Sequence, residues 1–148
     1  MTKSVPSKSL VLYADDDPDD LHLVEHAFSD YAQTVELKTF MDGEALLRYI
    51  NEYKDAEPFP CLIIIDINMP RINGKEVLKK LRETAGYEDA PVVLFSTSTL
   101  PADMAFAKSY GAGFMTKPLH YSQIYQLVDK MIDHCADDVK KYIRSTRK

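Results

Sequence analysis

Short apolar runs alternate with segments of helical periodicity along nearly the whole chain. The runs at 9–14, 61–66 and 91–96 are largely apolar, as in strands that are covered on both faces. Residues 34–40 alternate like a strand near a sheet edge, and 113–118 form a short fifth candidate. Apolar residues at helical spacing fill the intervals and predict five helices, over about 17–31, 42–53, 73–81, 100–110 and 120–132.

Short polar residues mark the beginnings of three of these helices. Asp17 is a candidate N-cap for the first helix, and Pro18 suits its first turn. Asp42 and Gly43 open the second helix, and Asn73 is a candidate cap for the third. The regular alternation of strand and helix predicts an α/β fold, in which a parallel sheet is covered by helices on both sides.

Composition narrows the class of protein. The chain has 148 residues, 45% of them apolar, which suits one domain with a substantial core. Its net charge of −5 argues against nucleic-acid binding by the domain as a whole. No apolar stretch approaches the roughly 20 residues of a membrane span, and the polar start lacks the apolar centre of a signal peptide. Cys61 and Cys135 show no metal or redox spacing, so we expect reduced core cysteines and a cytoplasmic protein.

Polar residues stand at the ends of four predicted strands. Asp15 and Asp16 follow the first strand, and Asp66 closes the third. Ser96 ends the fourth strand, and Lys117 lies at the end of the fifth. An open parallel sheet binds its ligands outside the carboxyl ends of its strands, where the strand order reverses. We therefore expect these five side chains to gather at one edge of the sheet.

A cluster of carboxylates at this edge is expected to bind a cation. Three carboxylates repel one another unless one takes a proton or a cation lies among them. Mg²⁺ suits the site because it is small, takes oxygen ligands and keeps several waters. Asp16 and Asp66 would each give one carboxylate oxygen, and Asp15 would hold a bound water. The backbone carbonyl of Asn68 would complete the protein ligands.

The remaining side chains suit a phosphoryl group. Lys117 supplies a compact positive charge, and Ser96 supplies a hydroxyl donor for a phosphoryl oxygen. A carboxylate can accept a phosphoryl group as an acyl phosphate, and this transfer needs mainly alignment and charge neutralisation. Asp66 is the predicted nucleophile, because it follows the most apolar strand and faces both the cation and the lysine.

Four segments carry a resemblance to a known family: "YADDDP", "IIIDINMPRINGKEVL", "PVVLFSTS" and "GAGFMTKPL". In order and spacing they resemble the response-regulator receiver domain of two-component signalling, of the chemotaxis-regulator type, over residues 9 to about 135. The resemblance implies a flavodoxin-like, doubly wound parallel sheet of five strands in the order 2-1-3-4-5, with five flanking helices. It also implies a signalling domain and not an enzyme acting on a separate substrate.

The resemblance assigns roles at the acidic site. It implies that Asp66 is the phosphoacceptor, and that a histidine kinase or phosphotransfer protein donates the phosphoryl group. Mg²⁺ would be held by Asp16, Asp66 and the Asn68 carbonyl, with Asp15 assisting. Lys117 would contact the phosphoryl group.

The resemblance further implies a conformational switch. Ser96 and Phe114 would form the switch pair, and a cis proline, Pro118, would follow Lys117. The face made by the fourth helix, fifth strand and fifth helix would then change its affinity for a downstream protein target. Phe114 stands where tyrosine is frequent, and a plain core aromatic is an equally good interpretation of that residue. The loop around 52–60 is longer than the family's shortest versions, and in this it resembles stand-alone regulators partnered with phytochrome-type kinases.

Two other functional classes compete with this one. Mg²⁺-dependent phosphohydrolases that form an aspartyl phosphate usually place a second aspartate two residues after the nucleophile, where this chain has Asn68. A degenerate receiver would normally have lost Asp66, Lys117 or a member of the acidic pair, and none is missing. His22 and His26 share a helix face without a third ligand in the sequence, which favours a solvated face over a metal site.

The predicted domain organisation has three parts. Residues 1–8 are a flexible leader, 9–136 the receiver domain, and 137–148 a basic C-terminal extension that can be helical. With no effector-sized segment after the fifth helix, we expect a single-domain regulator. The extension would either lengthen that helix and pair with a second copy as a homodimer, or form a frayed, solvated end.

Overall fold

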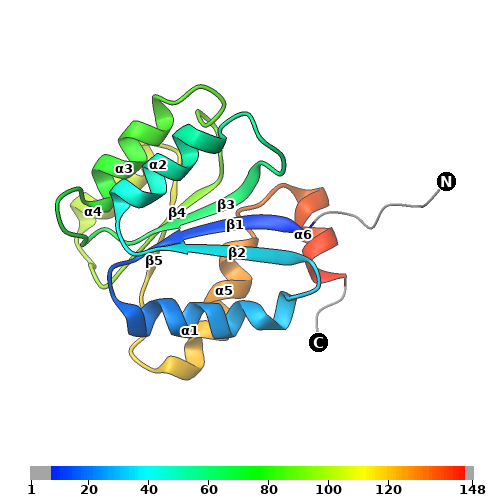
Figure 1. The fold of residues 1–148 in the computed structure, drawn as a ribbon. Helices are drawn as coiled ribbons and strands as arrows, with labels where there is room; N and C mark the ends of the chain where they lie inside the picture. Colours follow the sequence, from blue (N-terminus) through cyan, green and yellow to red (C-terminus); the bar gives the residue numbers. More distant parts are fainter. Residues whose placement is uncertain (1–7, 146–148) are drawn as a thin grey trace.

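Five parallel strands form the central sheet of the computed structural model, which describes residues 8–145 (Figure 1). The strand order is β2-β1-β3-β4-β5, and each neighbouring pair is parallel. This confirms the predicted flavodoxin-like architecture. The strands are β1 Ser9–Ala14, β2 Val35–Phe40, β3 Pro60–Ile65, β4 Val92–Ser96 and β5 Gly113–Thr116.

Helices cover both faces of the sheet. Figure 1 shows α1 and α5 on one face and α2, α3 and α4 on the other. Two short 3-10 turns, at Ser29–Tyr31 and Tyr121–Gln123, adjoin α1 and α5. The described residues contain one α-helix more than the five predicted. The α-helices are α1 Pro18–Phe28, α2 Gly43–Tyr53, α3 Gly74–Arg82, α4 Pro101–Ser109, α5 Ile124–Ile132 and α6 Asp137–Arg144.

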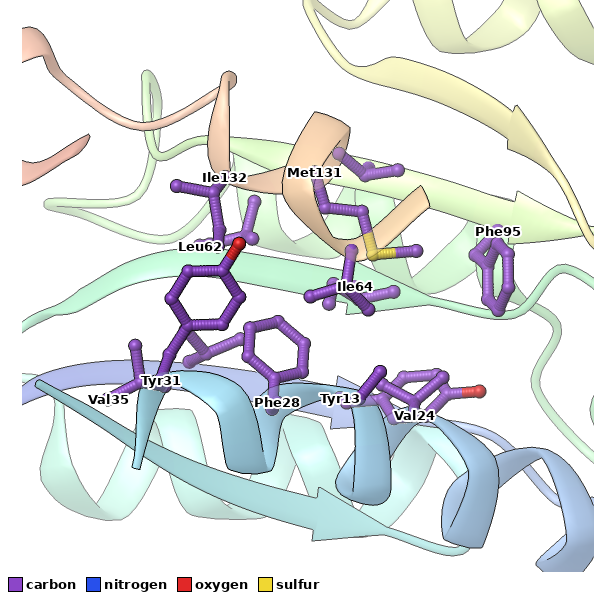
Figure 2. Close-up of a cluster of buried hydrophobic side chains, with 14 of the residues drawn as sticks. Tyr13, Val24, Phe28, Tyr31, Val35, Leu62, Ile64, Phe95, Met131 and Ile132 are labelled. Carbon is purple, nitrogen blue, oxygen red and sulfur yellow. The ribbon is translucent and has the colours of Figure 1, made fainter. Parts of the chain in front are cut away.

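The sheet divides the core into two layers, because successive side chains of a strand point to opposite faces. In β3, Leu62 and Ile64 pack towards α1 and α5, whereas Ile63 and Ile65 pack towards α2 and α3. All four side chains are fully buried. Figure 2 shows the first layer, where Phe28 of α1 and Met131 of α5 lie against Ile64.

The predicted caps hold the helix beginnings. Oδ1 of Asp17 accepts a hydrogen bond from the N–H two residues on at 2.9 Å. Asp42 and Asn73 each accept one from the N–H three residues on, at 2.8 and 3.0 Å. These bonds satisfy donors that the first turn of a helix leaves free, and they fix α1, α2 and α3 next to the strand ends.

The basic extension folds back onto the domain. The chain turns after α5, and residues 137–144 form the separate helix α6, so the extension does not lengthen α5. Ile143 is fully buried in the first core layer, and its carbonyl accepts a hydrogen bond from Thr34 Oγ1 at 2.7 Å. Arg144 donates to the backbone carbonyl of Asp129 at 2.8 Å and to the Asp133 carboxylate at 2.9 Å. Helix α6 is thus neither frayed nor fully solvated.

The structure bears on the predictions made for the chain ends, for membrane-spanning helices and for the two cysteines. Most of the leader, residues 1–7, and the last three residues of the extension lie outside the described part. Within residues 8–145, no helix is long and apolar enough to cross a membrane. Cys61 and Cys135 are both free thiols, the first half-buried and the second buried.

Candidate functional site

Four strands end side by side at one edge of the sheet. The residues that directly follow β1, β3 and β5 still form backbone hydrogen bonds with the last residue of a neighbouring strand. The N–H of Asp66 donates to the carbonyl of Ala14 at 3.0 Å, and the N–H of Lys117 donates to that of Ser96 at 2.8 Å. The N–H of Asp15 bonds in the same way to the last residue of β2. The carboxyl ends of β1, β3, β4 and β5 therefore present their polar residues together, as the sequence predicts.

Three carboxylates meet at this edge. Oxygens of Asp15, Asp16 and Asp66 all lie within 4.8 Å of one another. Asp15 is fully buried and Asp66 is 4% exposed, whereas Asp16 is open to solvent. Two buried carboxylates beside an exposed third form a site that a small cation can enter from one side. This is the predicted metal cluster, and it is the only such group of ligands among residues 8–145.

The loop after β3 is held tightly around Asp66. The N–H of Asn68 donates to Asp66 Oδ1 at 3.3 Å, and the N–H of Gly74 donates to the Ile67 carbonyl at 2.8 Å. A Cβ atom on Gly74 would collide with the Asp66 carbonyl oxygen, so only glycine fits this approach of α3 to the loop. The role of the Asn68 carbonyl as a metal ligand stays a prediction.

Lys117 lies at the centre of the carboxylates. Its Nζ is 2.8 Å from Asp15 Oδ2, 2.7 Å from Asp20 Oδ2 and 3.4 Å from Asp66 Oδ2, and its side chain is 9% exposed. Burial disfavours the charged ammonium and by itself would lower the pKa of Lys117. The hydrogen bonds with Asp15 and Asp20 outweigh the effect of burial, so the pKa of Lys117 is raised. The lysine is therefore a cation throughout the physiological pH range.

The Asp66 carboxyl is hard to ionise. Burial, followed by the charge of Asp15, raises its pKa from 3.8 to about 7, against the opposing effects of Lys117 and of the Asn68 N–H. One lysine thus only partly neutralises the cluster. A divalent cation among the carboxylates would favour the ionised, nucleophilic form of Asp66.

A scan against protein families matches the model described as the response regulator receiver domain over residues 11–129. The chain belongs to this family. Receiver domains act in two-component signalling, and as general features of the family they accept a phosphoryl group on an aspartate and bind Mg²⁺ at an acidic site.

Individual relatives agree with this assignment. Response regulator Rcp1 of Synechocystis sp. is 26% identical over 85% of this chain and 87% of its own, and its Mn²⁺-bound crystal structure superposes with a TM-score of 0.73. The phosphorylated cyanobacterial phytochrome response regulator RcpA has the same fold, at a TM-score of 0.79 and 24% identity over 94% of this chain and 96% of its own. A response regulator in red light signaling of R. palustris is 26% identical over 87% of this chain and 94% of its own, with a TM-score of 0.73.

The predicted switch residues of this receiver domain lie on the neighbouring strands β4 and β5. Ser96 is fully buried, and its Oγ accepts a hydrogen bond from the N–H of Ser98 at 3.2 Å. Ser98 in turn donates to Asp103 at 2.5 Å, and Asp103 forms an ion pair with Lys75 of α3. The loop after β4 is therefore tied to both α3 and α4.

Phe114 lies on β5, opposite Leu94 of β4, and is partly buried against the second core layer. This position suits both a core aromatic and a switch residue.

One predicted feature of the site is wrong. Pro118 follows a trans peptide bond, and the cis bond among the described residues is Glu57–Pro58. The sequence motif did not predict the isomer correctly. The cis and trans forms of a peptide bond before proline differ in free energy by only about 0.5–1 kcal/mol. Tertiary context, which a short motif does not contain, decides between them. The placement of Lys117 does not depend on this bond's being cis, since its ammonium already reaches the carboxylates.

Sequence reasoning missed two residues of the site. Tyr13 is buried, and its hydroxyl donates to Asp15 Oδ2 at 2.6 Å. Burial and the Asp15 charge raise the pKa of Tyr13, so it remains a donor. The sequence contained a signal for this contact, because Tyr13 and Asp15 are two residues apart and such residues point to the same face of a strand. Asp20 lies in the first turn of α1, and its contact with Lys117 joins residues 97 positions apart, which no local pattern reveals.

Proposed function

We propose that this receiver domain accepts a phosphoryl group on Asp66 from a histidine kinase or phosphotransfer protein and thereby switches a protein-interaction surface. The observation that carries the proposal is the meeting of Asp15, Asp16 and Asp66 within 4.8 Å, with Lys117 among them. Such a cluster suits phosphoryl transfer, in which alignment and charge neutralisation do most of the work.

The donor set fits Mg²⁺. It offers carboxylate oxygens and no sulfur or imidazole, and hard divalent cations prefer oxygen. Asp16 and Asp66 would bind the ion directly, Asp15 through a water, and the Asn68 carbonyl would complete the protein ligands. When bound, Mg²⁺ supplies positive charge that neutralises the carboxylates and the phosphoryl oxygens.

The transfer itself uses groups of this chain. A carboxylate oxygen of Asp66 attacks the phosphorus of a phosphohistidine, so that an O–P bond forms as the N–P bond breaks and the donor's imidazole takes up a proton. Lys117, already 3.4 Å from Asp66, follows the new phosphoryl group and binds one of its oxygens. Asp20 and Asp15 keep the ammonium in place until then.

The switch begins at the loop after β4. A phosphoryl oxygen on Asp66 attracts the Ser96 hydroxyl, which must give up the hydrogen bond from Ser98. Phe114 then turns towards the space that is vacated. The movement changes the surface formed by α4, β5 and α5, on which Leu100 and Met104 are exposed. Such a local charge change biases an equilibrium between two packings.

The phosphoryl donor is proposed to be a kinase of a light-sensing, phytochrome type. The long loop before β3 supports this, as does the similarity to the R. palustris regulator of red light signaling. Mixing the phosphorylated kinase with this chain and following loss of label from the kinase tests the pairing.

Incubation with acetyl phosphate and Mg²⁺, followed by intact mass measurement, tests phosphorylation directly. A labile added phosphoryl group that is lost in Asp66→Asn, and kept in the control Asp55→Asn at an exposed loop position, supports the proposal. Multiple turnover of added phosphoesters would indicate a phosphohydrolase, and absence of any adduct a degenerate receiver. Beryllofluoride, a phosphoryl mimic, should move the amide NMR shifts of residues 96–116, and unmoved shifts would exclude the switch.

A further inference from the structure

We infer that Cys61 and Cys135 are a redox-sensitive pair that closes to a reversible intramolecular disulfide. Their positions are 74 residues apart, yet the fold brings the two sulfur atoms to 4.0 Å. Cys61 stands near the start of β3, and Cys135 lies in the turn between α5 and α6. The inference is independent of phosphorylation, because both residues lie away from the acidic cluster.

The geometry requires only a short movement. A disulfide bond is about 2.05 Å long, so the sulfurs must approach by roughly 2 Å. Rotation about the Cα–Cβ bonds can supply much of this, since each sulfur is one bond away from Cβ. Cys135 is followed by the turn into α6, which can adjust more easily than a helix interior.

The two thiols differ in a way that sets the order of events. Cys61 is half-buried and can be reached from solvent, whereas Cys135 is 5% exposed. The Cys135 thiol donates its hydrogen bond to Cys61. That bond lowers the pKa of Cys61 despite burial, and the same bond together with burial raises the pKa of Cys135. Since the thiolate is the reactive form, Cys61 is the attacking residue and Cys135 the resolving one.

The oxidant is a peroxide, and the reaction balances in two steps. The Cys61 thiolate attacks one oxygen of hydrogen peroxide, the O–O bond breaks, and the released hydroxide takes a proton to leave as water. This gives a sulfenic acid. The Cys135 sulfur then attacks the Cys61 sulfur, the S–O bond breaks, and the thiol proton leaves with the hydroxide as a second water. Two thiols are oxidised to one disulfide, and one peroxide is reduced to two waters.

The bond would tie the turn before α6 to the sheet. Helix α6 is held in the reduced chain by the packing of Ile143 and by the contacts of Arg144 with α5 and the residue after it. Asp66 lies five residues beyond Cys61 along β3, about 16 Å away at strand spacing. The disulfide would therefore restrain α6 and leave the acidic cluster in place.

The experiment treats the folded, fully reduced chain with hydrogen peroxide and measures intact mass without reductant. We expect the mass of a monomer that has lost two hydrogens, a digest in which the peptides of Cys61 and Cys135 are linked, and full reversal by dithiothreitol. Amide hydrogen exchange in residues 137–144 should slow in the oxidised form. In Cys135→Ser, peroxide should leave a sulfenic acid on Cys61 that dimedone traps.

Other outcomes overturn the inference. An unchanged mass, disulfides only between chains, or oxidation of Cys61 to sulfinic acid without a linked peptide would each exclude the pair. Peroxide treatment of the chain in strong denaturant is the control, because the fold then no longer holds the two thiols close together. If the linked peptide forms as fast there as in the folded chain, the fold does not bring the thiols together. The linked peptide is measured in the wild-type chain, so the test holds even if Cys135→Ser fails to fold.

Discussion

Replacement of Asp66 by asparagine is expected to stabilise the folded chain at pH 8 when no divalent cation is present. Asparagine keeps the size and hydrogen-bonding shape of the protonated carboxyl but cannot ionise. In the wild-type chain, ionisation of Asp66 at pH 8 places a second buried carboxylate beside Asp15, with only Lys117 to neutralise both. The variant removes the repulsion between Asp66 and Asp15, and it removes the free-energy cost of burying the Asp66 charge.

The magnitude follows from the pKa of Asp66, about 7 in the folded chain against 3.8 as its ordinary value. The folded state keeps a proton that the unfolded state releases, so stability falls as pH rises from about 3.8 to about 7 and is then constant. Roughly 3 pH units at about 1.36 kcal/mol each give about 4 kcal/mol as an upper value. Loss of the contact with Lys117 offsets about 1 kcal/mol of this in the variant.

Urea denaturation followed by circular dichroism, in buffer with a chelator, measures the effect. The free energy of unfolding of Asp66→Asn should exceed that of wild type by about 2–3 kcal/mol at pH 8, and this difference should be about 2.5 kcal/mol smaller at pH 5. Added Mg²⁺ should stabilise wild type by about 3 kcal/mol at 100 times its dissociation constant and leave the variant nearly unchanged. Asp55→Asn, at an exposed position, is the matched control and should show neither effect.

Two results would refute this reasoning. Equal stability of variant and wild type at pH 8 would mean that neither burial nor repulsion destabilises the ionised Asp66. A difference in stability that does not change between pH 5 and pH 8 would mean that the stabilisation comes from something other than ionisation.

Three further substitutions test individual contacts by urea denaturation. Lys117→Met should destabilise the cation-free chain by about 3–5 kcal/mol at pH 8, because it leaves buried carboxylates without their cation; an effect as small as that of Lys54→Met, at an exposed position, would contradict this. Tyr13→Phe should cost about 1.5–3 kcal/mol by removing a buried hydrogen bond to a carboxylate, whereas Tyr121→Phe, at a residue 67% exposed, should be neutral. Ile143→Ala should cost about 2–4 kcal/mol, since the side chain is fully buried, and a loss below 1 kcal/mol would show that α6 does not contribute to the core.

The sequence was most informative where local chemistry and periodicity coincide. The five strands, the caps at Asp17, Asp42 and Asn73, and the placing of Asp66 and Lys117 at one edge all follow from short segments and the rules of parallel sheets. These features depend on residues near each other in the chain or on the common direction of the strands.

The misses arise from contacts between distant segments. The pairing of Asp20 with Lys117 and the approach of Cys61 to Cys135 depend on how helices dock, which residue spacing does not encode. The folding of α6 had a local signal, because Val139 and Ile143 lie four residues apart as on one helix face, and both contact the first core layer.

The docking of α6 changes where the folding unit ends. The family model stops at residue 129, inside α5, yet Met131, Ile132 and Ile143 all belong to the buried interior. A fragment trimmed to the family limits would uncover that interior and aggregate or unfold. An investigator who shortens this protein, or fuses a reporter to it, should therefore place the junction after residue 145.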